Sequence, residues 1–225
     1  ESAYRDREFV FKDRLHAGEL LADKLRLLLD DVDVQLLALP AGGVPVGYVV
    51  AQKLRIPLDV AIVRKIQIPW NTEAGFGAIT WDGRLLLNEL LVGQLGLSTE
   101  AVEQSISRTR EIVRQRVQTF RGTVPFPDLN GKTVVLVDDG LASGFTMLAA
   151  VESIRAEHPR KIIVAVPTGS ASAVELLAPK VGELVCLNIR GRPIFAVADA
   201  YEVWYDLSDE EVLGFLEEFE KTAST

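Results

Sequence analysis

The chain has few of the residues that build disulfides, metal clusters and membrane spans. Its 225 residues include one cysteine and two histidines. The single cysteine, Cys186, excludes an internal disulfide and a cysteine-built metal cluster, and its apolar neighbours predict a buried strand position. His16 and His158 have no partner at metal-ligand spacing, so we interpret both as structural. The longest uncharged stretch, residues 34–52, is broken by proline and glycine and cannot be a continuous membrane helix.

Basic residues are fewer than acidic ones. The formal net charge is -8 and the isoelectric point is about 4.9, so a surface that binds nucleic-acid backbones broadly is not expected. A small local anion site is compatible with this charge. Residues 1–15 mix acidic and basic side chains with few apolar ones, which excludes a signal-peptide core and predicts a cytoplasmic location.

Five short apolar runs alternate with longer amphipathic segments. The runs cover residues 34–40, 57–66, 132–140, 161–169 and 183–189. Because they are rich in Val, Ile and Leu without apolar-polar alternation, they predict strands buried on both faces, as in parallel sheets. Helices are predicted at residues 45–55, 99–121, 145–157 and 171–181. This order predicts an α/β fold with a Rossmann-like, five-stranded parallel sheet flanked by helices.

Both ends of the chain carry helix signals. A stripe of leucines between residues 15 and 28 predicts an N-terminal helix. Ser208 and Glu211 form a capping box that starts a C-terminal helix. Both termini are therefore expected to be anchored by regular structure.

Residues 67–92 differ from the alternating pattern. Their first part, residues 68–77, is expected to form a loop. Asp82 and Gly83 lie between two β-prone runs and predict a hairpin. We interpret the segment as a hood or lid beside the core, able to close over a site.

The segment VVLVDDGLASGFTM, residues 134–147, carries the strongest functional signal. Its four apolar residues predict a central strand, which places Asp138 and Asp139 at the carboxyl end, where open α/β sheets bind ligands. Gly140 lets the chain turn so that both carboxylates can reach one ligand. The small-residue loop that follows opens a helix, whose free N–H groups suit a phosphate. A ribose 5-phosphate matches both halves, with hydroxyls on the carboxylates and phosphate in the loop.

On this segment the chain resembles the type I phosphoribosyltransferases, whose signature is an apolar strand, two acidic residues and a Thr/Ser-Gly-x-Thr loop. The resemblance implies that Asp138 and Asp139 face the ribose hydroxyls of 5-phosphoribosyl 1-pyrophosphate and act as the catalytic pair. It also implies that the 5-phosphate is held by Ala142, Ser143, Gly144, Phe145 and Thr146. Phe145 is bulky where the family often has a small residue.

A second family element, the pyrophosphate loop after the first strand, is similar to LPAGGVPVG at residues 39–47. Paired glycines let backbone amides approach an anion closely. The resemblance implies that the pyrophosphate meets Ala41, Gly42 and Gly43. Relatives often carry Arg or Lys at the first of these positions, so one cation is missing here. Arg64 and Lys65, at the end of the second predicted strand, can supply it, although an exposed strand-end role is equally open.

The resemblance covers about residues 9–215 and implies transfer of 5-phosphoribose to a nitrogen acceptor, such as a nucleobase in salvage, with release of pyrophosphate. It implies Mg²⁺ as cofactor, held by Asp138 and Asp139 directly or through water. Relatives are commonly homodimers, and the oligomeric state of this chain stays open. Neither nucleic acid nor membrane is expected as a partner. We take residues 1–225 as one domain, with its core at about 30–66 and 130–190 and its hood at about 67–92 and 190–220.

Other interpretations stay open beside this one. A non-catalytic protein that binds the same sugar pyrophosphate and regulates a partner is the alternative function, and Ala41 is its best support. A sugar-phosphate phosphatase lacks a nucleophile-base pair, and Ser143 is one place too late for a hydrolase nucleophile. GFGAIT at residues 75–80 lacks the strand-turn-helix context of a dinucleotide fingerprint. Phe195 and Tyr201 either pack the hood or contact the acceptor.

Overall fold

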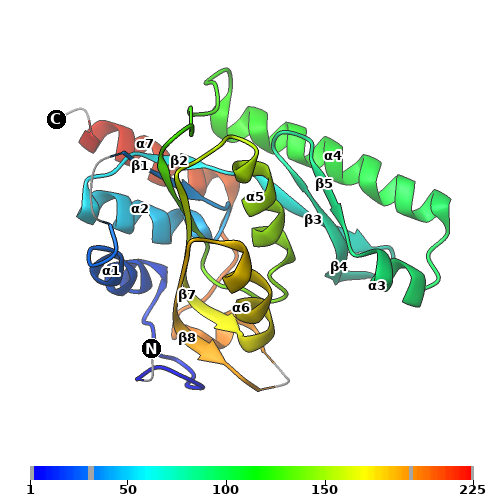
Figure 1. The fold of residues 1–225 in the computed structure, drawn as a ribbon, viewed down its shortest axis with the longest axis horizontal. Coiled ribbons are helices and arrows are strands. Elements are labelled where there is room, and N and C mark those ends of the chain that lie inside the picture. The colour runs from blue at the N-terminus through cyan, green and yellow to red at the C-terminus, as the bar shows by residue number, and fades with distance from the viewer. Residues whose placement is uncertain (1–2, 30–32, 193–194, 224–225) are drawn as a thin grey trace.

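A parallel sheet of five strands forms the centre of the molecule (Figure 1). The computed structural model describes residues 3–29, 33–192 and 195–223. The strand order is β2-β1-β6-β7-β8, and all neighbours are parallel. The strands are β1 (Val34–Ala38), β2 (Leu58–Val60), β6 (Thr133–Val137), β7 (Lys161–Ser170) and β8 (Glu183–Arg190). The predicted five-stranded parallel sheet is confirmed.

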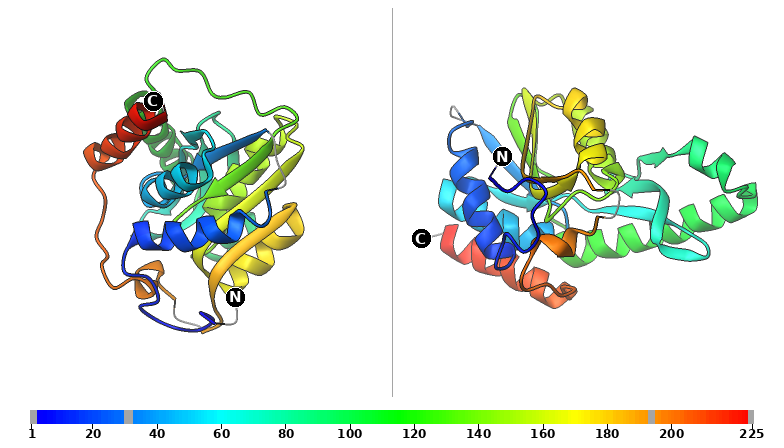
Figure 2. Two further views of the ribbon diagram at one scale, coloured as in Figure 1. Left: turned by 90° about the vertical axis from the view of Figure 1, so that its left-hand side faces the viewer. Right: turned by 90° about the horizontal axis from the view of Figure 1, so that it is seen from below.

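Helices cover both faces of this sheet, which is why its strands are apolar throughout. The helices of one face are α1 (Arg14–Leu25) and α2 (Gly43–Leu54), with α7 (Asp209–Ala223) against α2, and those of the other are α5 (Phe145–Arg155) and α6 (Ala171–Leu177) (Figure 2). In β6, Val135 and Val137 pack with the first group, while Val134 and Leu136 pack with the second. All four are fully buried, and such burial is the main favourable contribution to folding.

The register between β1 and β6 brings their carboxyl ends to the same edge of the sheet. Val34 pairs with Thr133, and Ala38 pairs with Val137. The loops that follow these two parallel strands therefore leave the sheet side by side. This edge holds most of the residues that the sequence motifs point to.

A second sheet and two helices form an arm beside the core (Figure 1). Its antiparallel strands are β3 (Val63–Ile68), β4 (Asn71–Thr80) and β5 (Leu85–Leu87), followed by α3 (Glu89–Gln94) and α4 (Thr99–Arg121). The hairpin predicted at Asp82 and Gly83 is confirmed as the connection between β4 and β5. The helix predicted at residues 99–121 is confirmed with the same bounds.

Two predictions for this part of the chain are wrong. The apolar run 57–66 is not one strand, because it divides into β2 in the main sheet and β3 in the arm. Residues 68–77, expected to form a loop, lie mostly in β4. A Cβ atom at Gly77 would lie 2.5 Å from the carbonyl oxygen of Leu86, so this glycine permits a close approach of neighbouring backbone. Gly75 and Gly77 are thus part of the pairing between β3 and β4.

The other helix predictions differ from the structure only at their ends. The helix expected from residue 45 begins at Gly43, and the one expected to reach residue 181 ends at Leu177, followed by a 3₁₀ turn at Ala178–Lys180. The N-terminal helix is present as α1. The capping box is confirmed, since the Ser208 N–H donates to Glu211 Oε2 at 2.8 Å and the Glu211 N–H donates to Ser208 Oγ at 3.2 Å.

The N- and C-terminal segments run side by side. The Phe9 N–H donates to the Asp199 carbonyl oxygen at 2.8 Å, and the Val203 N–H donates to the Lys12 carbonyl oxygen at 2.8 Å. The rings of Phe11 and Tyr201 lie 5.5 Å apart. This pairing carries the start of α1 towards the carboxyl edge of the sheet. Residues 30–32 and 193–194, which the predicted core and hood include, lie outside the described residues.

The position of the single cysteine agrees with the sequence prediction. Cys186 is buried in β8, as predicted, and burial raises the pKa of its thiol to about 12. Within the described part of the chain, no helix has both the length and the apolar character that crossing a bilayer requires.

The hairpin end of the arm is tied to the core, because Ser153 Oγ in α5 lies 3.1 Å from Asp82 Oδ1.

Candidate functional site

Asp138 and Asp139 follow β6 directly at the carboxyl edge of the sheet, and both side chains are partly buried. The Asp139 N–H donates to Asp138 Oδ1 at 2.8 Å. Burial raises the pKa of Asp138 well above its usual range, and the charge of Asp139 raises it further. Burial also raises the pKa of Asp139, but the guanidinium of Arg14 opposes this. Two coupled carboxylates thus meet at the predicted place, and they are not equivalent.

The loop between β1 and α2 presses against these carboxylates. A Cβ atom at Gly42 would lie 1.8 Å from Asp139 Oδ2, and one at Gly43 would lie 2.6 Å from the carbonyl oxygen of Val137. Gly42 has φ -62° and ψ -30°, which any residue adopts, so its requirement for glycine is steric. The glycine loop and the acidic pair, nearly a hundred residues apart in sequence, are in direct contact.

The second loop of the signature lies at the N-terminus of α5. Gly144 is the N-cap residue with φ 76°, a conformation that favours glycine. Ser143 Oγ accepts from the Phe145 N–H at 3.4 Å, and the Ser170 hydroxyl donates to the Ala142 carbonyl oxygen at 2.7 Å. The structure therefore places the predicted phosphate loop, Ala142, Ser143, Gly144, Phe145 and Thr146, at a helix start, where backbone N–H groups have no intrahelical acceptor.

Arg14, which sequence reasoning missed, completes this edge. Its Nε donates to Asp139 Oδ2 at 2.9 Å, and the two side chains are only 8% and 13% exposed. A second guanidinium nitrogen donates to the Tyr205 carbonyl oxygen at 2.9 Å, and the Trp204 ring centroid lies 3.9 Å from Arg14 Cζ. The available signal is that Arg14 follows the N-cap Asp13 directly, although the first turn of a helix favours acidic residues.

Comparison with known proteins identifies the family of this chain. A family model described as the phosphoribosyl transferase domain matches residues 12–189, a range that contains Arg14, both loops and the acidic pair. The chain belongs to the phosphoribosyltransferase family. Protein TT1426 from Thermus thermophilus, whose crystal structure is known, is 38% identical with a TM-score of 0.75, covering 93% of this chain and 98% of that one. The expected type I phosphoribosyltransferase fold is confirmed.

Two further relatives share sequence with this phosphoribosyltransferase domain. Rv0571c from Mycobacterium tuberculosis strain H37Rv, provisionally named a phosphoribosyl transferase, is 39% identical over 209 residues, which are 92% of this chain and 46% of that protein. The chain thus spans about half the length of the curated relatives it matches. A ribose-phosphate pyrophosphokinase from Pyrococcus furiosus is 33% identical over 78 residues, or 34% of this chain.

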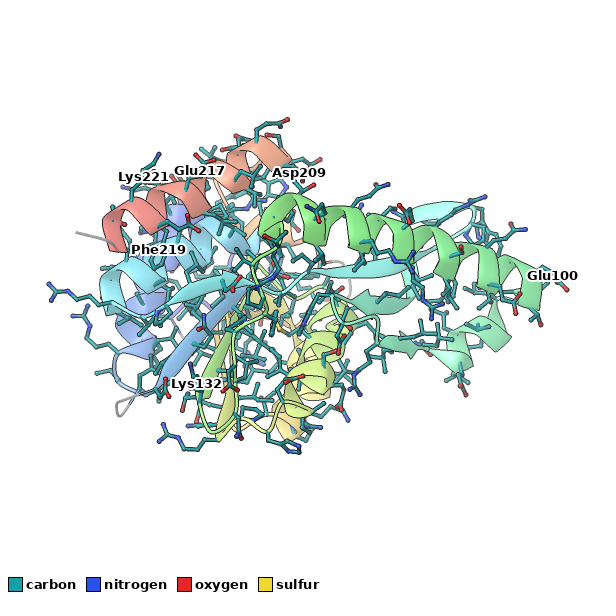
Figure 3. The ribbon with its side chains drawn as sticks, turned by 90° about the horizontal axis from the view of Figure 1, so that it is seen from above. Glu100, Lys132, Asp209, Glu217, Phe219 and Lys221 are labelled. Atoms are coloured by element: carbon teal, nitrogen blue, oxygen red, sulfur yellow. The ribbon has the colours of Figure 1, made fainter. Side chains whose placement is uncertain are left out.

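Arg64 and Lys65 lie on opposite faces of β3, because successive strand residues alternate. Burial lowers the pKa of Arg64, the charge of Arg116 lowers it further, and Asp209 opposes both. Arg116 pairs with Asp209 at 2.7 Å, and Figure 3 shows Asp209 at the start of α7, beside the core end of α4. Lys65 instead lies over Gly75 of β4. Only one of the two predicted cations can therefore face the pyrophosphate loop.

The two aromatic residues that the sequence left open have different surroundings. Tyr201 is 1% exposed, its ring lies between those of Phe11 and Trp204, and its hydroxyl donates to the Asp139 carbonyl oxygen at 2.6 Å. This favours hood packing. Phe195 lines a cavity of about 560 Å³ together with Ala142 and Ser143 of the phosphate loop. Phe195 thus borders open space beside the predicted phosphate loop.

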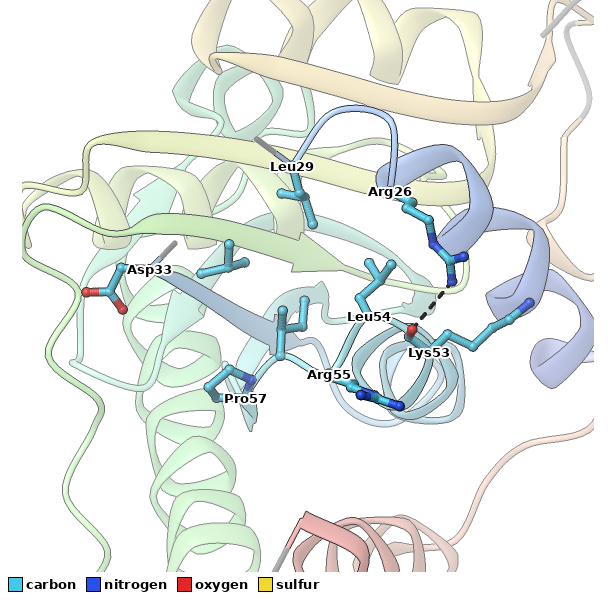
Figure 4. A pocket seen from close by; sticks show the side chains of 9 residues that line it. Arg26, Leu29, Asp33, Lys53, Leu54, Arg55 and Pro57 are labelled. Carbon is cyan, nitrogen blue, oxygen red and sulfur yellow. Dashed lines mark hydrogen bonds between the residues drawn. The ribbon is translucent and has the colours of Figure 1, made fainter. Parts of the chain in front are cut away.

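A second cavity, of about 480 Å³, lies at the other edge of the sheet, where β1 begins and α2 ends (Figure 4). Arg26, Lys53 and Arg55 are among its lining residues, and Arg26 donates to the Lys53 carbonyl oxygen at 3.5 Å. Because open α/β sheets bind ligands beyond the carboxyl ends of their strands, we place the functional site at the acidic pair.

Asp138 and Asp139 can supply part of the coordination shell of the expected magnesium ion. Within the part of the chain that the structure describes, no group of three or more His, Cys, Asp or Glu residues gathers around one point. Asp138 and Asp139 supply hard oxygen ligands, and Mg²⁺ commonly takes one or two carboxylates, several waters and substrate phosphates. The ligand would have to complete such a site.

Proposed function

We propose that this protein transfers the 5-phosphoribosyl group of 5-phosphoribosyl 1-pyrophosphate to a nitrogen acceptor, with release of pyrophosphate. One observation carries the proposal: Gly42 touches the carboxylate of Asp139, while the loop of residues 142–146 opens α5 at the same edge. The edge thus offers an anion loop, two carboxylates and a second anion loop. A ribose with pyrophosphate at C1 and phosphate at C5 has the matching order of groups.

In the proposed reaction the bond from C1 to the pyrophosphate oxygen breaks, and its electron pair leaves with pyrophosphate. The lone pair of the acceptor nitrogen forms the new C1–N bond, and the proton of that nitrogen passes to solvent or to the leaving group. Positive charge that builds on the ribose ring is stabilised by Asp138 and Asp139. The amides of Gly42 and Gly43 stabilise the negative charge of the leaving group. No covalent nucleophile is needed.

Magnesium dependence is part of the proposal. Mg²⁺ bound with the donor would neutralise part of the negative charge of the pyrophosphate. Asp138 and Asp139 are the residues proposed to hold it, directly or through water. Since burial raises the pKa of Asp138, a falling pH protonates this carboxyl early, and cation binding should weaken as the pH falls.

A nucleobase is the proposed acceptor. Phe195 borders the cavity beside the phosphate loop, and an aromatic side chain offers a stacking surface for a planar ring. Arg190 and Arg192 line the same cavity, so the acceptor has polar as well as apolar surroundings. This chemistry would place the protein in nucleobase salvage in the cytoplasm.

Pyrophosphate release with the donor, Mg²⁺ and a panel of purine and pyrimidine bases tests the proposal. We expect turnover with at least one base and none without the donor. Donor binding without turnover on any base would favour the non-catalytic regulatory alternative, which the neutral side chain of Ala41 supports. A protein that does not bind the donor at all would contradict both functions.

Arg64 is the better candidate for the cation that Ala41 lacks. Ala41 packs against the side-chain cluster that contains Ile66, which lies on the same face of β3 as Arg64. Arg64→Met is expected to weaken binding of magnesium pyrophosphate about tenfold, the loss of one charge-assisted hydrogen bond, and Lys65→Met by less than about threefold. Calorimetric titration of both variants decides this, and equal losses would contradict the assignment.

A further inference from the structure

Arg14 joins three distant segments of the chain at one carboxylate. It is the first residue of α1, its Nε donates to Asp139 Oδ2 at 2.9 Å, and Asp139 lies 125 residues further along the chain. Its second contact, to the Tyr205 carbonyl oxygen, reaches the C-terminal hood segment. The same Oδ2 lies directly under Gly42 of the glycine loop. One side chain thus connects α1, the acidic pair and the hood.

The chemistry of these contacts requires an arginine. A planar guanidinium donates in two fixed directions and stacks on an aromatic face at the same time. Arg14 does this with Asp139, Tyr205 and the Trp204 ring, whose centroid lies 3.9 Å from Cζ. An ammonium group can place its charge near the carboxylate, but it cannot reproduce the two directions and the stacking.

Asp139 is held through its backbone carbonyl oxygen and through its side-chain carboxylate. The Tyr201 hydroxyl donates to the backbone carbonyl oxygen at 2.6 Å, and Arg14, itself held by Tyr205, binds Oδ2 of the side chain. Tyr201 and Trp204 are in ring contact at 5.1 Å, so these two supports pack on each other. Arg14 binds Oδ2 and not Oδ1 of Asp139, and the carboxyl of Asp139 also contacts that of Asp138.

We propose that Arg14 is a positioning residue, which fixes the Asp139 carboxylate so that Oδ1 accepts one hydroxyl of the ribose. This inference rests on the proposed function and adds a residue that lies outside both anion loops. Asp138, which has no such support from Arg14, is left to meet the other hydroxyl. Each hydroxyl is therefore recognised through a different carboxylate, and only one of them depends on Arg14.

Binding of ribose 5-phosphate and of its 2-deoxy and 3-deoxy analogues, measured with Mg²⁺ by calorimetry, tests the inference without an acceptor. The wild type is expected to prefer the full ribose by about tenfold or more over each analogue, the contribution of one hydrogen bond to a charged group. In Arg14→Met one of these preferences is expected to fall to about twofold, while the other is retained. Arg14→Lys should lose the same preference, and it serves if the first variant does not fold.

The matched control is Arg121→Met. Arg121 also forms a buried ion pair, with Asp59, and its side chain is only 4% exposed, but it lies in α4. This variant is expected to lose thermal stability and to keep both hydroxyl preferences. Retention of both preferences in the Arg14 variants, loss of both together, or an equal loss in Arg121→Met would overturn the inference. A wild type that does not bind ribose 5-phosphate would instead overturn the proposed function, while one that binds all three sugars equally would overturn the inference alone.

Discussion

Asp138→Asn is expected to lower turnover about 100-fold or more, and in the same protein to raise the stability of the ligand-free fold at neutral pH. The loss of turnover follows from the proposed role of this carboxylate beside the positive charge of the transition state. The gain in stability follows from its surroundings, because the carboxyl is partly buried and stands next to a second carboxylate. A residue that stabilises the transition state at the expense of the empty fold is typical of catalytic positions.

The direction of the expected stability change follows from the pKa of Asp138. The pKa of Asp138 is raised in the folded protein, first by burial and then by the charge of Asp139. Its contribution to stability is therefore fully present below the unfolded pKa of about 3.9 and is lost as the pH rises through the folded pKa. Asparagine does not ionise, so it avoids this loss. The asparagine side chain also keeps an oxygen that can accept from the Asp139 N–H, as Asp138 Oδ1 does in the wild type at 2.8 Å.

Unfolding of wild type and variant without Mg²⁺, from about pH 3.5 to about pH 8, checks this expectation. The two proteins should be equally stable at the acidic end, and the advantage of Asp138→Asn should grow with pH and then level off. Asp23→Asn is the control, because Asp23 is an exposed surface acid paired with Lys53, and it should show no such trend. A variant less stable than wild type at neutral pH would contradict the assigned cost of burial.

The acidic pair shows what the sequence can and cannot distinguish. Two adjacent aspartates after a strand look equivalent, and their position at the carboxyl edge follows from the apolar run before them. Their difference comes from Arg14, and a contact across 125 residues leaves no local pattern in either segment. Asp139→Asn would leave the buried guanidinium of Arg14 without its carboxylate, which commonly costs about 3–5 kcal/mol. Substitution of Asp138 therefore tests the catalytic role of the pair with less disturbance of the fold.

The fold was predictable where the signal is local. Strands buried on both faces need continuous apolar residues, so four of the five runs correspond to strands of the sheet. The run at residues 57–66 was predicted as one strand. The chain crosses from β2 to β3 through Ala61 and Ile62, which are as buried as the strands themselves. No polar or glycine residue marks that transition. Tertiary packing of the arm, rather than local preference, decides where the first sheet ends.

Gly42→Ala is expected to destabilise the protein by about 3 kcal/mol or more, through overpacking and the loss of a buried ion pair. The added Cβ would lie 1.8 Å from Asp139 Oδ2 and 2.3 Å from its Cγ, so either the loop or the carboxylate must move. The backbone at Gly42 is already helical, and alanine adopts it without strain. The whole cost therefore comes from Asp139, and donor binding should be lost with it. Urea unfolding gives the stability, and calorimetry gives the binding.

Two further variants isolate that contact. Gly214→Ala is the matched control, since no atom lies within 4 Å of a Cβ at this exposed position in α7, and alanine there should stabilise the helix by up to about 1 kcal/mol. In an Asp139→Ala background the colliding carboxylate is absent, so Gly42→Ala should cost far less than it does in the wild type. An equal cost in both backgrounds would mean that the glycine is required for some reason other than its contact with Asp139. A small cost in the Asp139→Ala background alone would tie the glycine loop directly to the acidic pair.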